Sequence, residues 1–322
     1  MRIAVVGATG ALGGELFAAL DDARLPVDAI VPIATDRSLG TDVDFQGLAV
    51  PVETSLAALR GADLAFLCAP PDASLEATRL CLQAKVPAID CAGALAGAAE
   101  VPLVAELPVG PALDAPVLAI PPGVALAAAR VLGPLHRALG ISRVAATVLE
   151  SASGAGRAGV HALSEETIAL LSQREAPDPP ALGHPVAFDV LPWTGTIEGD
   201  GDTAAERRFA VIVGRLLGGA PVAATIVRAP VFCGDALVLA VETAQPASAA
   251  AAIEALAKAD DVELGAPAPT TRAAAGSEAV HVGRIRRDAS RPGGLLLWAA
   301  ADGLRLTAAH AVRVAEARFG RA

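Results

Sequence analysis

The sequence has few cysteines and no excess of basic residues, and each absence excludes a class of protein. Its four cysteines form no C-x-x-C pair and have no paired histidines beside them, which argues against a zinc site or a disulfide framework. A reducing, cytoplasmic compartment is therefore expected. The net charge of -10 argues against nucleic-acid binding, which relies on basic patches that neutralise phosphates.

Long hydrophobic runs are also absent, although hydrophobic residues make up 53% of the chain. The longest stretch without a charge, 115–129, is shorter than the roughly 20 residues needed to span a bilayer, and Pro121 and Pro122 interrupt it. Residues 1–6 read as a strand that enters a glycine turn, so no signal peptide is expected. We predict a protein without a membrane segment, and its 322 residues suffice for two domains.

Strands and helices alternate in the first part of the chain. An apolar run and a glycine turn precede a helical pattern with Leu12, Leu16 and Leu20 on one side. Further elements are expected at 29–33 (strand), 55–60 (helical), 64–68 (strand), 74–84 (helix) and 86–90 (strand). Such alternation predicts an α/β fold, with a Rossmann-like parallel sheet and helices on both of its faces.

From about residue 127 the pattern changes to long β-rich segments separated by helical stretches, which is typical of an α+β domain. The tail, 304–319, has helical periodicity and is expected to return to the first domain. We therefore predict one domain formed by 1–127 with the C-terminal helix, 300–322, and a second formed by 128–299. The proline-rich stretch 176–185 is expected to be a surface loop.

A glycine motif marks the expected nucleotide site. Gly7, Gly10 and Gly13 form G-x-x-G-x-x-G between the first strand and the first helix. Glycines there let the backbone approach a pyrophosphate, to which the start of a helix offers unpaired N–H groups. The alternative is a merely tight turn, but the strand-loop-helix context favours a cofactor site. The expected contacts are Gly7, Thr9, Gly10, Ala11, Leu12 and Gly13.

The segment after the second strand bears on the choice of cofactor. Residues 34–40 read ATDRSLG, and Arg37 and Ser38 could hold the 2′-phosphate of NADP. A solvated turn is the alternative interpretation. NADP is favoured slightly over NAD.

Several ordered motifs resemble the aspartate-semialdehyde dehydrogenase family over nearly the whole chain. They are GATGALG at 7–13, RSLG at 37–40, VPLVAEL at 101–107, SGAG at 153–156, VAFDVLP at 186–192, ATIVRAPVF at 224–232, LLLWAAADGLR at 295–305 and HAVRVAEA at 310–317. The resemblance implies a second domain that binds substrate and forms a homodimer. It also implies that Ser153 and Gly154 contact the cofactor.

The family's catalytic residues are not found at the matching positions. Its chemistry needs a thiolate nucleophile and a base that takes the thiol proton. The segment that resembles the family's NPxC reads AIPPGVA, with Val124 at the place of the cysteine, or Gly123 if the alignment shifts by one. The family's histidine, seven residues after the arginine of its VRxP motif, corresponds to Asp235.

Other positions of the family's site differ as well. Glu150 stands where the family has glutamine, and Ala96 where it has a phosphate-holding arginine. Arg228 and Glu206 match substrate-binding positions, and Arg208 replaces a lysine. The loop after the strand at 64–68, which is glycine-rich in the family, contains Pro70 and Pro71 and so offers fewer backbone donors.

Another residue could in principle take over the chemistry. Cys91 and Cys233 could act as a relocated nucleophile, and His161 and His184 are possible bases by residue type alone. A thiol without a basic neighbour stays mostly protonated near neutral pH, which disfavours this alternative. We expect a divergent family member that binds a ligand or partners an active subunit. The competing hypothesis is an active NAD(P)-dependent oxidoreductase on a small carbonyl or acyl-phosphate substrate.

Overall fold

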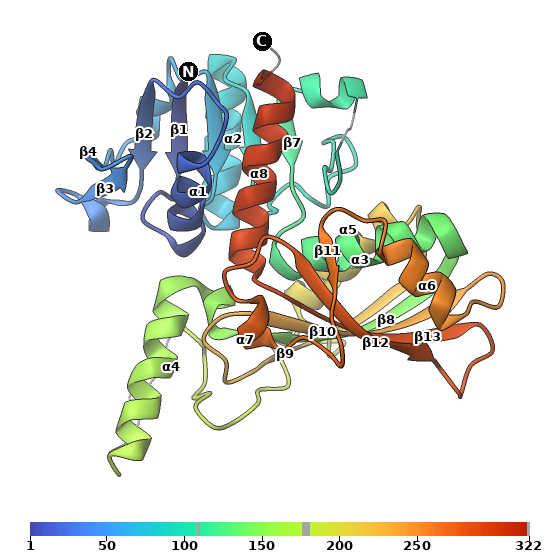
Figure 1. Ribbon diagram of the computed structural model, residues 1–322. Coiled ribbons are helices and arrows are strands. Elements are labelled where there is room, and N and C mark those ends of the chain that lie inside the picture. Colours follow the sequence, from blue (N-terminus) through green and yellow to red (C-terminus); the bar gives the residue numbers. More distant parts are fainter. Residues whose placement is uncertain (108–109, 176–180, 321–322) are drawn as a thin grey trace. The chain divides into compact units, whose positions relative to one another are not determined.

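The computed structural model describes residues 1–107, 110–175 and 181–320 (Figure 1). Residues 176–180 of the expected proline-rich loop lie outside this range. The chain divides into two compact units, Met1–Pro122 with Thr307–Ala322, and Gly123–Leu306. These boundaries differ from the expected 127/128 and 299/300, since a helix of the second unit already begins at Gly123 and the last strand runs to Ala301.

The first unit contains a five-stranded parallel sheet. Its strand order is β2 (Ala29–Ile33), β1 (Arg2–Val6), β5 (Leu64–Leu67), β6 (Ala88–Asp90) and β7 (Val117–Ala119). The remaining elements are α1 (Ala11–Asp21), α2 (Pro71–Ala84), the hairpin β3 (Asp42–Phe45) and β4 (Leu48–Pro51), and the 3-10 helices η1 (Asp36–Ser38), η2 (Leu56–Leu59) and η3 (Gly110–Asp114). Ile3 to Val6 are all buried, as expected for a parallel strand covered on both faces.

The order in which the chain adds strands reverses beside β1, which has β2 on one side and β5 on the other. α1 connects β1 to β2 in one direction along the sheet, and α2 connects β5 to β6 in the other direction. Right-handed crossovers therefore place the two helices on opposite faces. Ligands of such sheets bind at the carboxyl ends of the strands beside the reversal.

The C-terminal helix α8 (Gly303–Phe319) ends in the first unit. Its His310 Nε2 lies 2.9 Å from Val104 O, and Arg318 Nη1 donates to Ala115 O at 2.8 Å. Glu316 accepts a hydrogen bond from Arg24 N at 2.7 Å. The first unit is thus completed by residues from the far end of the chain.

The second unit contains a mixed six-stranded sheet. Its order is β11 (Val262–Leu264), β12 (Val280–Arg287), β13 (Gly294–Ala301), β10 (Asp235–Thr243), β8 (Ile141–Glu150) and β9 (Val222–Arg228). The other elements are α3 (Gly123–Leu139), α4 (Gly156–Leu171), α5 (Ala204–Leu216), α6 (Ala249–Leu256), α7 (Thr271–Ala274) and η4 (Ala152–Ala155). The predicted α/β class, with a parallel sheet followed by a mixed α+β domain, is confirmed.

The two faces of the mixed sheet differ. α3, α5 and α6 pack on its strands. The alternate side chains that point to one face of the sheet, including Val148, Leu239 and Leu297, are buried. On the opposite face Val238 is 37% exposed and pairs across the sheet with Thr147 and Trp298. In the part of the chain that the structure describes, no helix has the length and apolarity to cross a bilayer.

Candidate functional site

The glycine turn of the first unit has the geometry that a nucleotide loop needs. Gly7 has φ +86°, and a Cβ there would lie 2.7 Å from Ala69 N. A Cβ on Gly13 would lie 2.4 Å from Gly7 O, so glycine is required for the helix to pack on the loop. α1 begins after Gly10 without a side-chain cap. Backbone N–H groups of its first turn therefore remain available to an anion.

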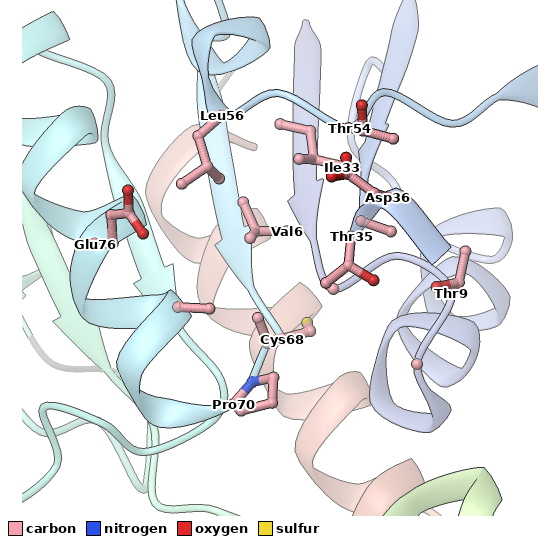
Figure 2. A pocket seen from close by; sticks show the side chains of 15 residues that line it. Val6, Thr9, Ile33, Thr35, Asp36, Thr54, Leu56, Cys68, Pro70 and Glu76 are labelled. Atoms are coloured by element: carbon pink, nitrogen blue, oxygen red, sulfur yellow. The ribbon is translucent and has the colours of Figure 1, made fainter. Parts of the chain in front are cut away.

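A pocket of about 480 Å³ opens beside this turn (Figure 2). It lies at the carboxyl ends of β1, β2 and β5, where the strand order reverses. Its lining consists of Val6, Gly7, Thr9, Gly10, Ile33, Ala34, Thr35, Asp36, Thr54, Leu56, Cys68, Ala69, Pro70, Ala73 and Glu76. The mixture of apolar walls and a few polar groups is typical of a small-molecule site.

The charged residues among the described lining residues are Asp36 and Glu76. Arg37 and Ser38 lie in η1 next to the pocket but do not line it. Ser38 Oγ is 3.0 Å from Thr9 Oγ1, so η1 is tied to the glycine turn. Of the expected cofactor residues, the structure thus brings Gly7, Thr9 and Gly10 to the pocket wall.

A second polar group of residues gathers in the second unit, where β8 and β9 end and β10 begins. We call Glu150, Ser151, Ser153, Arg228 and Asp235 the strand-end cluster. Glu150 pairs with Arg228 across β8 and β9, and Leu149 pairs with Ala236 across β8 and β10. The sheet register therefore brings Glu150, Arg228 and Asp235 together from three strands. Ser153, which was expected to contact a cofactor, joins them from η4.

The strand-end cluster satisfies its own hydrogen bonds. Asp235 Oδ1 accepts from Ser151 N and from Ser151 Oγ, each at 2.8 Å. Ser151 Oγ and Ser153 Oγ are 2.9 Å apart. Arg228 Nη2 lies 3.0 Å from Glu150 Oε2, and Arg228 Nη1 donates to Ser151 O. The guanidinium expected to bind substrate is thus paired with a carboxylate of the chain itself.

The cluster is nearly closed to solvent, and this burial changes the pKa values of its two carboxyl groups. The pKa of Asp235 is raised to about 7, first by burial and then by the nearby charge of Glu150, against the hydrogen bonds from Ser151. Burial also raises the pKa of Glu150, while Arg228 and then Arg208 act to lower it. Asp235 is therefore a carboxyl group that titrates near neutral pH.

Asp235 and the start of α3 approach each other at Gly303, which has no side chain. A Cβ on Gly303 would lie 2.7 Å from Asp235 Oδ2 and 3.1 Å from Gly123 Cα. The two positions that the sequence identified for the base and, in the shifted alignment, the nucleophile are therefore neighbours. A side chain at residue 303 would separate them.

The remaining expected substrate residues have different surroundings. Glu206 is buried at the start of α5, where its Oε2 accepts from Thr203 N at 2.8 Å and its Oε1 accepts from Ile226 N at 2.9 Å. Both carboxylate oxygens therefore serve the helix start and the adjacent strand. Arg208 is exposed on the same helix and acts on Glu150 through its charge.

The comparisons with known proteins agree with this geometry. Residues 2–108 match the semialdehyde dehydrogenase NAD-binding domain, and residues 132–306 match the semialdehyde dehydrogenase dimerisation domain. Aspartate-semialdehyde dehydrogenase of Streptomyces akiyoshiensis is 34% identical over 98% of both chains. The structure of aspartate semialdehyde dehydrogenase II from Vibrio cholerae complexed with ASA superposes with a TM-score of 0.92 at 30% identity, covering 99% of this chain and 98% of that one. The chain belongs to the aspartate-semialdehyde dehydrogenase family.

A probable aspartate-semialdehyde dehydrogenase from Pseudomonas aeruginosa has a TM-score of 0.87 and 31% identity over 98% of this chain and 97% of its own. Val124, which the resemblance placed at the position of the family's cysteine, is half-buried in the first turn of α3. Ala96, which was expected at the position of the family's arginine, is fully buried in the loop after β6. Gly154 lies in η4, where a Cβ would be 2.7 Å from Glu150 Oε1.

The alternative nucleophiles and bases lie elsewhere. Cys91 is buried in the first unit, and Cys233 is exposed two residues before Asp235. His161 is exposed on α4 beside Glu165, and His184 is exposed next to Pro185. Among the described residues, no three His, Cys, Asp or Glu side chains are grouped so that they could hold a metal ion.

Sequence reasoning did not identify Asp36, Glu76 or Ser151. Asp36 lies three residues after the end of β2 and just before Arg37, so its place in the sequence could have identified it. Glu76 reaches the pocket from the second turn of α2, which requires knowing that this helix begins at Pro71. The place of Ser151 beside Asp235 follows only from the register of β8 with β10.

Proposed function

We propose that this chain is a dinucleotide-binding member of the family that does not carry out the family's thiol-dependent semialdehyde dehydrogenation. The neighbourhood of Gly303 supports this best. A thiol acyl transfer needs a nucleophile beside a base. Here the buried carboxyl group of Asp235 lies beside a helix start formed by Gly123 and Val124, neither of which is a nucleophile.

The pairing within the strand-end cluster supports the same conclusion. A free guanidinium is the usual grip on a carboxylate or phosphate. Arg228 is bound to Glu150 and to the Ser151 carbonyl, so an acidic substrate would have to displace an ion pair between a buried guanidinium and a half-buried carboxylate. Ala96 offers no replacement for the second anion-binding arginine.

One observation favours a second candidate function. A carboxyl group with a pKa of about 7 suits general acid or base catalysis near neutral pH. An oxidoreductase of this kind would act on a small carbonyl or acyl-phosphate substrate, with Asp235 moving the proton and without a covalent thiol intermediate. Asp235→Asn would abolish such an activity.

The cofactor is proposed to be NADP, held over the glycine turn with its pyrophosphate at the start of α1 and its 2′-phosphate near Arg37 and Ser38. The free N–H groups of α1 and the pocket support dinucleotide binding. Asp36 on the pocket wall opposes the 2′-phosphate. Arg37 must therefore outweigh Asp36 for NADP to be preferred over NAD.

The second unit is proposed to form a homodimer through the exposed face of its sheet. That face presents Val238, Thr147 and Thr225 in one row across three strands. These side chains carry no charge, and two-fold assembly is the commonest way in which such a face is covered. The match to a dimerisation domain supports dimerisation of this unit.

The proposal is tested by assaying the purified protein for phosphate-dependent oxidation of aspartate semialdehyde with NADP and with NAD. The Streptomyces akiyoshiensis relative serves as the positive control. We expect no turnover above background, together with a rise in melting temperature when NADP is added.

Turnover would contradict the proposal, and three variants would identify its origin. Loss of turnover in Cys233→Ser or in Cys91→Ser would establish a relocated thiol nucleophile. Loss only in Asp235→Asn would establish the second candidate function.

A further inference from the structure

Cys68 and Cys91 directly follow two neighbouring strands. β5 and β6 pair in parallel with Leu67 opposite Asp90, so the next residue on each strand lies on the same side of the sheet. Cys91 N donates to Leu67 O at 3.0 Å, which keeps the register to this point. A side-chain interaction with Cys68 contributes to the raised pKa of Cys91, and Cys91 Sγ also lies 3.5 Å from Ile89 O. The pair is therefore close enough to react.

The two thiols differ in access. Cys91 is fully buried, whereas Cys68 is half-buried and lines the glycine-turn pocket (Figure 2). Burial, and then the hydrogen bond with Cys68, raise the pKa of Cys91 well above its ordinary value. A small oxidant entering the pocket therefore meets Cys68 first, with Cys91 directly behind it.

The backbone of Cys68 is coupled to the nucleotide loop. A Cβ on Gly7 would lie 2.7 Å from the carbonyl carbon of Cys68 and 2.7 Å from Ala69 N, so this peptide packs directly on Gly7. Cys91 is held more firmly, because the preceding Asp90 accepts hydrogen bonds from Ala92 N and Leu95 N. A bond between the sulfurs would therefore displace Cys68 and, with it, the glycine turn.

We propose that Cys68 and Cys91 form a reversible disulfide when the protein meets a hydroperoxide, and that the reduced form is the one that binds the dinucleotide. The Cys68 thiolate attacks the peroxide, the O–O bond breaks, and a sulfenic acid and hydroxide form. The Cys91 sulfur then attacks the Cys68 sulfur and the S–O bond breaks. The Cys91 proton leaves with the hydroxyl group as water. The protein loses two electrons and the peroxide gains them.

The consequence for nucleotide binding rests on the proposed cofactor site, whereas the disulfide itself does not. Cys81 and Cys233 serve as internal references for the chemistry. Cys81 is buried on α2, where burial raises its pKa to about 11, and Cys233 is exposed. Peroxide is therefore expected to oxidise Cys233 without forming a partner bond and to leave Cys81 unchanged.

The disulfide is tested by treating the full chain with hydrogen peroxide, blocking free thiols with iodoacetamide and digesting with trypsin. Cleavage after lysine and arginine places the four cysteines in separate peptides, 61–79, 80–85, 86–130 and 229–258. We expect a cross-link between 61–79 and 86–130 that dithiothreitol removes. Oxidised Cys233 without this cross-link would overturn the proposal.

The effect on the pocket is tested by measuring NADP and NAD affinity before and after oxidation. We expect oxidation to weaken binding roughly tenfold, as is typical of coupled sites, and dithiothreitol to restore it. Cys91→Ala should bind as the reduced wild type does and lose little on oxidation, and Cys68→Ser gives a second variant without the disulfide. An equal loss in oxidised wild type and oxidised Cys91→Ala would overturn the coupling. Absence of nucleotide binding in the reduced protein would reject the proposed cofactor site and, with it, the coupling, while the peptide result would still decide the disulfide.

Discussion

At the scale of single residues, Asp235 makes stability depend on pH. Its pKa rises from 3.8 to about 7 on folding, so the folded state holds a proton that the unfolded state has lost. The stability that this proton contributes is present below about pH 4 and is lost as pH rises to about 7. We expect the free energy of unfolding to fall by about 1–4 kcal/mol over this interval.

Asp235→Asn removes this titration and keeps an oxygen that can accept the hydrogen bonds from Ser151. Urea unfolding at pH 5 and at pH 8 should show a smaller difference in the variant than in wild type. Glu254→Gln, at an exposed site, serves as the control. A variant with the same decline as wild type would place the titration elsewhere.

Charge at the end of β2 should decide between NADP and NAD. Arg37→Ala should lower the ratio of NADP to NAD affinity because it removes the cation nearest the expected 2′-phosphate. Asp36→Asn should raise the ratio roughly 3- to 10-fold, since about 1 kcal/mol of repulsion is lost. Calorimetric titration with both nucleotides measures this, with Arg60→Ala as the control. An unchanged ratio in Arg37→Ala would show that this residue does not contact the phosphate.

At the scale of elements, α5 depends on Glu206. The residue forms a capping box with Thr203 and also accepts from the buried Ile226 N, so its loss leaves donors without a partner. We expect Glu206→Ala to reduce the free energy of unfolding by about 2–3 kcal/mol. Ser248→Ala, at the single exposed cap of α6, should cost about 1 kcal/mol.

Chemical denaturation measures both values. A negligible cost for Glu206→Ala would mean that the cap is dispensable. The substrate-binding role suggested by the family resemblance would then be the better explanation for this carboxylate.

The elements also show where sequence reasoning succeeds. β2 was expected at 29–33 and occupies Ala29–Ile33, because a short apolar run between turn residues has few alternatives. α2 begins at Pro71 rather than 74, since proline is well tolerated in the first turn. α3 was not anticipated, and Pro134 lies inside it. Its first turn nevertheless contains Gly123 and Val124, the two positions that the resemblance assigned to the nucleophile.

The candidate site was predictable only in part, because some of its residues belong to one local motif and others are brought together by contacts between distant strands. Gly7 and Gly10 belong to one local motif, so their shared position follows from the sequence alone. Asp235 and Ser151 are brought together by the antiparallel register of β8 and β10, which no local pattern specifies. The pairing of Arg228 with Glu150 likewise depends on a parallel contact between distant strands.

At the scale of the whole molecule, the oligomeric state should depend on Val238. Val238→Lys would place an ammonium group between Thr147 and Trp298 on the exposed sheet face. If that face is the dimer interface, the variant should become monomeric because a buried unpaired charge is strongly unfavourable. Light scattering at micromolar concentration measures the mass.

Val211→Lys provides a matched control for this variant. Val211 is 54% exposed on α5, which packs on the opposite face of the sheet. This control should remain dimeric. A wild-type protein with the mass of a single chain would reject the homodimer.

The return of α8 to the first unit affects how the protein can be made. The second unit is contiguous in the chain, so all of its residues leave the ribosome before the last helical turns do. The first unit must wait for Glu316 and Arg318 to reach Arg24 and Ala115. During synthesis the nucleotide domain is therefore the later of the two to be completed, although its first strand is made first. A premature stop after residue 306 would leave the second unit intact and deprive the first of its closing helix.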